Sequence, residues 1–478
     1  MNMRKTKIIC TLGPAVDHAE TIERLIRTGM NAARFNFSHG SHAEQLARLN
    51  MFKKVRDTLG APVATILDTK GPEIRIKTFA DGPVTLEQGQ GFILTTDDVP
   101  GDGRRVSVTY ANLHKEVGPG CRILVDDGLI ELRVQKVEGH EIHCEVENGG
   151  PLSSNKSINI PDVHILLPSL TDKDREDLKF AVDNDFDFIA ASFVRKASDV
   201  EDIRAELRKH GGDNIRIIAK IENREGVENL EGIIAASDGI MVARGDLGVE
   251  IPAHEVPILQ KKMIKATIRA GLPVITATQM LDSMIRNPRP TRAEVSDVAN
   301  AVFDGTSCVM LSGETASGKY PIEALSTMVN TVTAAEEAID YWGRFRERSL
   351  LPVVSGISDA ITHSCCLTAM DLNASAILAA TRSGYTAKVI SRFRPACPIV
   401  ALCQNESTRR QLAISWGVHP YLSGEVDSTD RLFSMAVDVA RREGAVACGD
   451  TVVITAGVPI GKSGSTNLIK AQIVQETL

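Results

Sequence analysis

The run IRIIAKIEN at residues 215–223 combines the apolar pattern of a buried strand with a cation and an anion, Lys220 and Glu222. Successive side chains of a strand point to opposite faces, so these two residues share one face among aliphatic neighbours. Chains seldom bury an unpaired ammonium or carboxylate, because burial of a lone charge is costly. Taken alone, the pair is equally compatible with an internal ion pair and with a functional site.

Polar side chains also follow other apolar runs, at the points where those runs end. Singly, such residues are most often helix caps, loop residues or surface charges. Several of them at one edge of a fold would be hard to explain by structural roles alone. In chain order they are Arg34, Asn36, Ser38 and His39; Asp68, Thr69 and Lys70; Arg244, Gly245 and Asp246; and Thr276 and Thr278.

Two of these run ends offer a metal site and an anion site. Glu222 and Asp246 suit one Mg²⁺, a hard cation that takes one or two carboxylates together with substrate oxygens and water. Gly245 and Gly248 would lie at the start of a short helix, where the absence of side chains lets backbone N–H groups approach an anion. Lys220 beside the metal would place a charge where a transferring phosphoryl group is negative. We therefore expect phosphoryl or enolate chemistry on a small anion.

The elements that must position these residues alternate strand and helix. Short apolar strands begin near residues 7, 31, 62, 186, 215, 239, 273 and 307, and most are followed by helical spacing. Eight such units predict a (β/α)8 TIM barrel, in which the active site forms at the carboxyl ends of the strands. A doubly wound sheet is the alternative, but it leaves the count of eight unexplained.

The remaining sequence predicts two further domains in an α/β chain. Residues 71–167 contain short strands separated by Gly, Pro and Asp-Gly turns, which indicates a small β-barrel lid domain inserted after the third strand. The barrel is then expected to comprise residues 1–70 and 168–348. A linker at 351–356 leads to a C-terminal α/β domain, 349–478, with alternating helices and strands.

Composition excludes several classes of partner. The chain has 478 residues, a net charge of −7 and few aromatic residues, which disfavours binding of nucleic acid. No apolar run is long enough for a signal peptide or a membrane span. The nine cysteines are scattered without a Cys-x-x-Cys pair, as in a reduced, cytoplasmic protein. We expect small-molecule substrates.

Six sequence strings resemble the pyruvate kinase family, and the similarity covers essentially the full chain in family order. They are RFNFSHG at 34–40, LDTKGPEIR at 67–75, IAKIEN at 218–223, ARGDLGVE at 243–250, ATQML at 277–281 and SDVANAVFDG at 296–305. Pyruvate kinases also insert a mobile β domain after the third strand. The resemblance implies transfer of the phosphoryl group of phosphoenolpyruvate to ADP, giving pyruvate and ATP, the last step of glycolysis.

By this resemblance, the substrate phosphoenolpyruvate is held by Arg34 and Lys220 at its phosphate. Lys220 would stabilise the phosphoryl group during transfer. The backbone amides of Gly245 and Asp246, with the hydroxyl of Thr278, would hold the carboxylate.

The family also implies a proton relay and a divalent cation. Enolpyruvate would be protonated through water near Thr278 and Ser296, so both are expected to be catalytic together with Lys220 and Arg34. Glu222 and Asp246 match the residues that hold Mg²⁺ or Mn²⁺ in the family.

A monovalent-cation site is implied as well, because Asn36, Ser38, Asp68 and Thr69 match a K⁺ site built from oxygen ligands. Family members that need K⁺ carry glutamate where this chain has Glu73, whereas K⁺-independent members carry lysine. The resemblance therefore implies activation by K⁺.

The nucleotide is expected between the barrel and the lid. Asn36 and His39 match contacts from the barrel, and Arg75 and Lys156 match contacts to the nucleotide phosphates from the lid. Asp127 either reaches the site when the lid closes or forms an ordinary hairpin turn, and its sequence context fits both.

Two loops of the C-terminal domain are candidates for an effector site. The run 457–463 approaches a P-loop but has three residues between its glycines instead of four. With a hydroxyl-rich turn before a helix it resembles the family's site for a phosphorylated allosteric effector, either a sugar phosphate or a nucleotide monophosphate. Two well-capped surface loops are the alternative. The residues are Thr381, Arg382, Ser383, Gly384, Thr386, Lys462, Ser463 and Gly464. Family members are usually homotetramers.

Two other functions fit parts of this pattern. A Mg²⁺-dependent barrel lyase or aldolase also holds an enolate with Glu and Asp, but it needs neither Lys220 nor a lid with Arg75 and Lys156. A metabolite-sensing scaffold would keep the pocket without turnover. If Lys220 faces the phosphoryl group and Glu222 the metal, the two side chains need not pair with each other.

Overall fold

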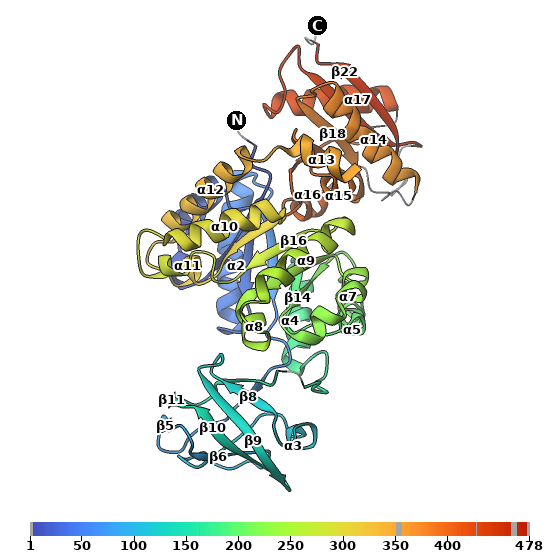
Figure 1. Ribbon diagram of the computed structural model, residues 1–478. Coiled ribbons are helices and arrows are strands. Elements are labelled where there is room, and N and C mark those ends of the chain that lie inside the picture. The colour runs from blue at the N-terminus through green and yellow to red at the C-terminus, as the bar shows by residue number, and fades with distance from the viewer. Residues whose placement is uncertain (1–2, 162, 350–355, 427, 460–465, 476–478) are drawn as a thin grey trace.

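The computed structural model describes residues 3–475 apart from 162, 350–355, 427 and 460–465. Its three domains lie in a row, with a closed barrel in the middle, a small β domain at one end and an α/β domain at the other (Figure 1). The β domain is inserted between the third and fourth strands of the barrel.

Eight strands form the barrel: β1 (Lys7–Leu12), β2 (Ala32–Asn36), β3 (Ala64–Asp68), β13 (Phe188–Ala191), β14 (Arg216–Ile221), β15 (Gly239–Ala243), β16 (Val274–Ala277) and β17 (Cys308–Leu311). They close in the order β1-β17-β16-β15-β14-β13-β3-β2, and all neighbours are parallel. The predicted barrel is confirmed, and the doubly wound alternative is wrong because the sheet has no edge.

Helices cover the outside of this barrel. Three of them begin at capping boxes, in which Ser41, Thr171 or Thr291 accepts a hydrogen bond from the backbone N–H three residues later. The helices are α1 (Ala19–Thr28), α2 (His42–Leu59), α4 (Asp172–Asp183), α5 (Ala197–Lys209), α6 (Arg224–Glu228), α7 (Leu230–Ala236), α8 (Arg244–Glu250), α9 (Val256–Arg269), α10 (Arg292–Asp304), α11 (Gly313–Ala316), α12 (Pro321–Glu337) and α13 (Tyr341–Ser349), with 3-10 turns at Pro14–Val16 and Asp282–Ile285.

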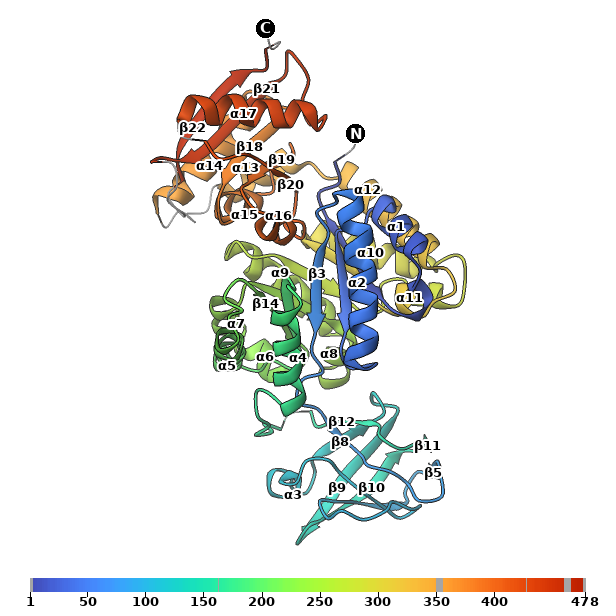
Figure 2. The same ribbon diagram turned by 180° about the vertical axis from the view of Figure 1, so that it is seen from behind.

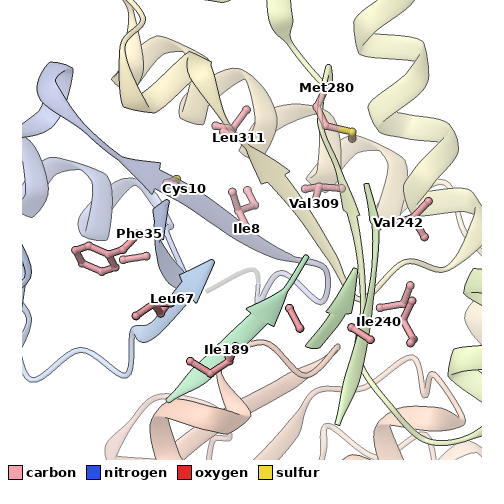
Figure 3. Close-up of a cluster of buried hydrophobic side chains, with 14 of the residues drawn as sticks. Ile8, Cys10, Phe35, Leu67, Ile189, Ile240, Val242, Met280, Val309 and Leu311 are labelled. Carbon is pink, nitrogen blue, oxygen red and sulfur yellow. The ribbon is translucent and has the colours of Figure 1, made fainter. Parts of the chain in front are cut away.

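The period of two along each strand divides the barrel residues into two cores. Ile8, Cys10 and Phe35 belong to the core between strands and helices (Figure 3). Ile9 and Ile218 belong to a separate core inside the barrel. Because Lys220 and Glu222 have the same parity as Ile218, the alternation directs both toward the barrel axis, at the carboxyl end.

The inserted domain is a seven-stranded sheet in the order β4-β12-β8-β9-β10-β6-β7, with a separate ribbon of β11 and β5. A bridge between Ile76 and Val108 joins the edges that continue β4 and β7, so the sheet rolls into the small barrel that we expected. Its elements are β4 (Ile74–Arg75), β5 (Val84–Leu86), β6 (Gly91–Thr95), β7 (Arg105–Ser107), α3 (Leu113–Glu116), β8 (Arg122–Val125), β9 (Ile130–Glu138), β10 (Glu141–Asn148), β11 (Gly150–Leu152) and β12 (Ser157–Asn159).

The C-terminal domain has a five-stranded sheet in the order β20-β19-β18-β21-β22, with only β22 antiparallel. The expected α/β alternation is present, but our reading of the sequence missed α16 and β20. Pro420 interrupts the pattern of β20, and this proline is tolerated because β20 is an edge strand. The elements are α14 (Ile357–Asp371), β18 (Ala376–Thr381), α15 (Tyr385–Arg392), β19 (Ile399–Cys403), α16 (Glu406–Leu412), β20 (Val418–Leu422), α17 (Thr429–Arg442), β21 (Thr451–Gly457) and β22 (Thr466–Ile473). Most of the predicted linker lies outside the described residues.

The C-terminal domain docks on the amino ends of the barrel strands, with α15 and α16 against the barrel (Figure 2). Ile414 enters the core inside the barrel. Arg410 forms an ion pair with the buried Asp187 at 2.8 Å, just before β13. The lid and the C-terminal domain therefore lie at opposite ends of the barrel axis.

Candidate active site

Four predicted residues form one ion-pair network inside the mouth of the barrel. Lys220 Nζ lies 3.0 Å from Asp68 Oδ1 and 3.0 Å from Glu222 Oε1. Arg34 Nε donates to the other oxygen of Asp68 at 2.6 Å. We expected that Lys220 and Glu222 need not pair, but in this structure they pair directly. Attraction between opposite charges is stronger in the low-dielectric interior, so each cation pairs with the carboxylates close to it.

Two residues of this network were missed in the sequence. Ser192 Oγ accepts a hydrogen bond from Lys220 Nζ at 2.6 Å, and Thr11 Oγ1 accepts one from Arg34 at 3.0 Å. Both residues have the inward parity of their strands and lie at the carboxyl ends, a position that could have identified them. Phe193 N–H donates to Glu222 Oε2 at 2.6 Å, so each oxygen of this carboxylate has a partner.

Burial and charge perturb the acids and bases of the network. Burial raises the pKa of Glu222 to about 7, and Asp246 adds to this rise while Lys220 opposes it. Burial also acts to lower the pKa of Lys220, but Asp68 and Glu222 outweigh it, so the pKa is raised and the ammonium stays charged. Despite burial, Arg34 and Lys220 keep the pKa of Asp68 below its usual value.

The residues at the barrel mouth fit a divalent cation. Glu222 is a buried carboxylate, and the charge of Asp246, in the first turn of α8, raises its pKa further. A cation between them would relieve that repulsion, and carboxylate oxygens are ligands that Mg²⁺ prefers. No group of three or more His, Cys, Asp and Glu side chains in the described part of the chain could hold a metal. A cation here would therefore also need oxygens from substrate or water.

The predicted carboxylate site has a different arrangement from the one expected. Gly245 N–H donates to Thr278 Oγ1 at 2.7 Å, so in this structure the amide and the hydroxyl bind each other. Thr278 has a φ of 68°, a left-handed conformation that is strained for a β-branched residue. Arg244 donates to the carbonyl of Thr278 at 2.7 Å and pairs with Asp297 of α10, which secures this turn.

Two residues near this turn have other partners. Ser296 lies in the first turns of α10, where its hydroxyl accepts a hydrogen bond from Asn300 at 3.4 Å. Thr276 does not lie at the barrel mouth. It faces the outer layer and bonds Thr306 at 2.9 Å, because its neighbours Ile275 and Ala277 take the inward positions of β16.

The residues predicted to hold K⁺ follow β2 and β3, which are adjacent strands. Asn36 Oδ1 accepts from Ser38 N–H at 3.1 Å, which folds the loop after β2. Thr69 Oγ1 accepts from Ser192 N–H at 3.3 Å. The set supplies hydroxyl, amide and carboxylate oxygens, and Asp68 is shared with the network of Arg34 and Lys220.

The predicted nucleotide contacts are divided between the domains. His39 is exposed in the loop after β2. In the lid, Arg75 Nε pairs with Glu73 at 2.9 Å, and Lys156 Nζ pairs with Asp126 at 2.9 Å. Asp127 forms the turn between β8 and β9, where its carboxylate accepts from Ser157 Oγ at 2.9 Å, so in this structure it has the turn role.

Those predicted effector residues that the structure describes lie far from this mouth, in the C-terminal domain. Gly384 caps α15 with a φ of 82°. Thr386 Oγ1 lies 2.7 Å from Thr466 Oγ1, which brings the start of α15 next to the start of β22. Lys462, Ser463 and Gly464 lie outside the described residues.

A lidded (β/α)8 barrel with a lysine and two carboxylates at its mouth defines an enzyme that acts on anionic substrates. Family models agree, since the pyruvate kinase barrel domain matches residues 3–325 and the pyruvate kinase alpha/beta domain matches residues 359–472. Pyruvate kinase of Clostridium acetobutylicum is 50% identical over 474 residues, covering 99% of this chain and 100% of that protein. Those of Staphylococcus haemolyticus and Geobacillus stearothermophilus are 50% and 49% identical over 100% and 99% of this chain, and 81% of each relative. The chain belongs to the pyruvate kinase family and is a phosphotransferase.

No helix of the described residues is both long and apolar enough to cross a bilayer.

Proposed function

We propose that this chain transfers the phosphoryl group of phosphoenolpyruvate to ADP, forming pyruvate and ATP. The observation that carries the proposal is the charged Lys220 at the barrel mouth, where it pairs with Asp68 and Glu222. Arg34 lies beside it and also pairs with Asp68. These two cations supply the charge that a phosphoryl group needs during transfer, when its oxygens carry dispersed negative charge. The names of the relatives support the same reaction.

Phosphoryl transfer requires exchange of partners within this network. Arg34 and Lys220 now hold carboxylates. Lys220 Nζ has three hydrogens and three partners, Asp68, Glu222 and Ser192, so the substrate phosphate would have to displace one of them. The carboxylate of the substrate would displace the contact between Gly245 N–H and Thr278 Oγ1.

The proton needed by enolpyruvate would come from the side of Thr278. Its hydroxyl donates to the carbonyl of Ala277 at 2.6 Å in this structure, so it has a proton to direct. Ser296 is proposed to order the water that delivers the proton. Lys220 is not proposed as the donor, since its raised pKa keeps the proton on the ammonium.

Glu222 and Asp246 are proposed to hold Mg²⁺ or Mn²⁺, and Asn36, Ser38, Asp68 and Thr69 to hold K⁺. When bound, the divalent cation supplies positive charge to the oxygens of the substrates. Asn36, His39, Arg75 and Lys156 are proposed to bind ADP, and closure of the lid would bring the last two to the barrel mouth and exclude water.

Regulation and assembly belong to the same proposal. The adjoining starts of α15 and β22 are proposed to bind a phosphorylated metabolite in a cytoplasmic homotetramer. Such an effector changes activity only if it binds one state of the protein better than another. The supporting observation is the contact between Thr386 and Thr466, which brings the start of α15 next to the start of β22.

The test is an assay of ATP formation from phosphoenolpyruvate and ADP in the presence of Mg²⁺ and K⁺. We expect turnover that is lost when K⁺ is replaced by tetramethylammonium or when Mg²⁺ is chelated. Turnover of a phosphorylated or enolisable substrate without any nucleotide would instead support a barrel lyase. Repeating the assay with sugar phosphates and nucleotide monophosphates, on the native chain and on Arg382→Ala, tests the effector site.

A further inference from the structure

A small cavity lies where the C-terminal domain meets the amino ends of the barrel strands, at the opposite end from the active site. The barrel contributes the turn from Gly271 to Pro273 after α9, and Ser307 before β17. The C-terminal domain contributes α15 and Trp416, and both views place α15 against the barrel (Figures 1 and 2). The cavity is therefore shared by two domains.

The lining of this cavity is strongly positive. It includes Lys388 and Arg392 from α15 and Arg394 from the turn that follows. None of the described residues that line it carries a carboxylate. Asp359 pairs with Arg392 at 3.2 Å but is not part of the lining. Three cations around one cavity repel each other unless an anion lies between them.

Several donors at the cavity lack an acceptor. Ser415 Oγ and Arg392 Nε are buried without a hydrogen-bond partner, and Ser415 is 4% exposed. Lys388 is half-buried, and its side chain makes no hydrogen bond or ion pair with any other described residue, although the charge of Asp238 acts on it. A buried donor without a partner is uncommon, because it loses its hydrogen bond to water and gains no acceptor in return. Ser415 and Arg392 both line the cavity, which indicates that an acceptor from outside the chain belongs there.

The protein itself has little freedom to supply that acceptor by rearrangement. Arg394 donates to Ser391 O at 3.0 Å and to Ser307 Oγ at 3.0 Å, and its guanidinium lies 4.8 Å from the ring centre of Trp416. Ser391 Oγ donates to Trp416 O at 2.6 Å. These contacts fix one wall of the cavity and join Ser307 of the barrel to the C-terminal domain.

The size of the free space selects among ligands. The room at the centre is about that of one water molecule, which is too small for a phosphate with four oxygens. A water molecule would fit, but it is neutral and has only two lone pairs, so it cannot offset the repulsion between three cations. A chloride ion is larger than a water molecule but smaller than a phosphate, and it carries a negative charge and accepts hydrogen bonds from several donors at once.

We propose that this cavity binds one small monovalent anion, chloride, which joins the C-terminal domain to the barrel through Lys388, Arg392 and Ser415. The proposal is independent of the reaction at the barrel mouth. Burial and the nearby Arg216 lower the pKa of Lys388 to about 8, opposed by Asp238, and a bound anion would favour the charged ammonium.

Trp416 provides a direct readout of occupancy. It is 2% exposed and lines the cavity, and Trp342 is the only other tryptophan of the sequence. In a Trp342→Phe protein, emission is to be measured while KBr replaces potassium gluconate at constant K⁺. Bromide quenches an indole in contact with it, so we expect saturable quenching that chloride reverses by competition. Quenching that rises linearly, with no effect of chloride, would overturn the proposal.

Two variants test the assignment of the residues in the same Trp342→Phe background. Lys388→Met is expected to raise the bromide dissociation constant at least about tenfold, because a charged hydrogen bond is lost. Ser415→Ala is expected to raise it less and removes no charge, so it serves where the lysine variant folds poorly. Lys54→Met, on the exposed face of α2, is the control and should leave quenching unchanged. Unaltered quenching in both cavity variants would place the anion elsewhere.

Discussion

Lys220 at the barrel mouth and Lys156 in the lid are both paired with carboxylates, but the two pairs differ in burial. The side chains of Lys220 and Glu222 are 10% and 1% exposed, whereas those of Lys156 and Asp126 are 36% and 19% exposed. Buried pairs interact strongly and are costly to break, while exposed pairs are worth about 0–1 kcal/mol. The barrel thus keeps its charges in place without substrate, and the lid can exchange a carboxylate for a phosphate at little cost.

The largest expected effect comes from removing the buried cation. Lys220→Met should lower kcat by about 10²–10³ or more, because a focused charge is lost from the transferring group. It should also destabilise the protein by up to about 3–5 kcal/mol, because Asp68 and Glu222 lose their shared partner. Initial rates and urea unfolding measure the two effects. Lys54→Met is the control, and near-normal turnover in Lys220→Met would contradict the assigned role.

Binding of the divalent cation should depend on pH through Glu222. Its pKa of about 7 means that the carboxyl is protonated below this pH, and the proton must leave before a cation binds. We expect apparent Mg²⁺ affinity to fall by up to about tenfold per pH unit below pH 7 and to level off above about pH 8. Calorimetric titrations of Mg²⁺ at several pH values measure this, with Glu222→Gln as the control. Affinity that is flat from about pH 6 to 8 would exclude this carboxylate as the titrating ligand.

The lid cations should act on the nucleotide alone. Arg75→Met and Lys156→Met are each expected to raise the KM for ADP about tenfold, since each removes a charged hydrogen bond to a phosphate. The KM for phosphoenolpyruvate should change little, because no described contact joins these residues to Arg34 or Lys220. A steady-state kinetic analysis with each substrate varied separates the two constants. Equal changes in both would show that the lid also positions phosphoenolpyruvate.

The contrast between barrel and lid explains what the sequence could and could not predict. Barrel strands are buried on both faces, so their apolar runs are continuous, and their inward parity placed Lys220 and Glu222 together. The inward parity of Ser192 at the end of β13 makes it a candidate, but parity alone does not show which group the hydroxyl binds. Its role depends on Lys220 lying opposite on β14, which only the register of the closed barrel determines.

Pairings between distant segments were the least predictable feature. Nothing in the local sequence of Asp126 indicates Lys156 as its partner, since the two meet through the antiparallel pairing of β8 with β12. The contact between Gly245 and Thr278 likewise follows from the neighbouring positions of β15 and β16. The residue types alone predicted the chemistry of the site. The contacts that these residues make in the absence of substrate could be identified only from the fold.

The smallest expected effect is also the sharpest test of the exposed pair. In the lid, Asp126 competes with the nucleotide for Lys156, so Asp126→Asn should lower the KM for ADP by up to about fivefold, corresponding to a pair worth about 0–1 kcal/mol. Asparagine tolerates the left-handed backbone at this position, where φ is 55°, so the turn is preserved.

Asp127→Asn is the matched control, because the Asp127 carboxylate accepts from Ser157 rather than from Lys156. Kinetics with ADP varied give the answer. A higher KM in Asp126→Asn alone would mean that Asp126 orients Lys156 for the phosphate, and the lid pair would then resemble the preorganised pairs of the barrel.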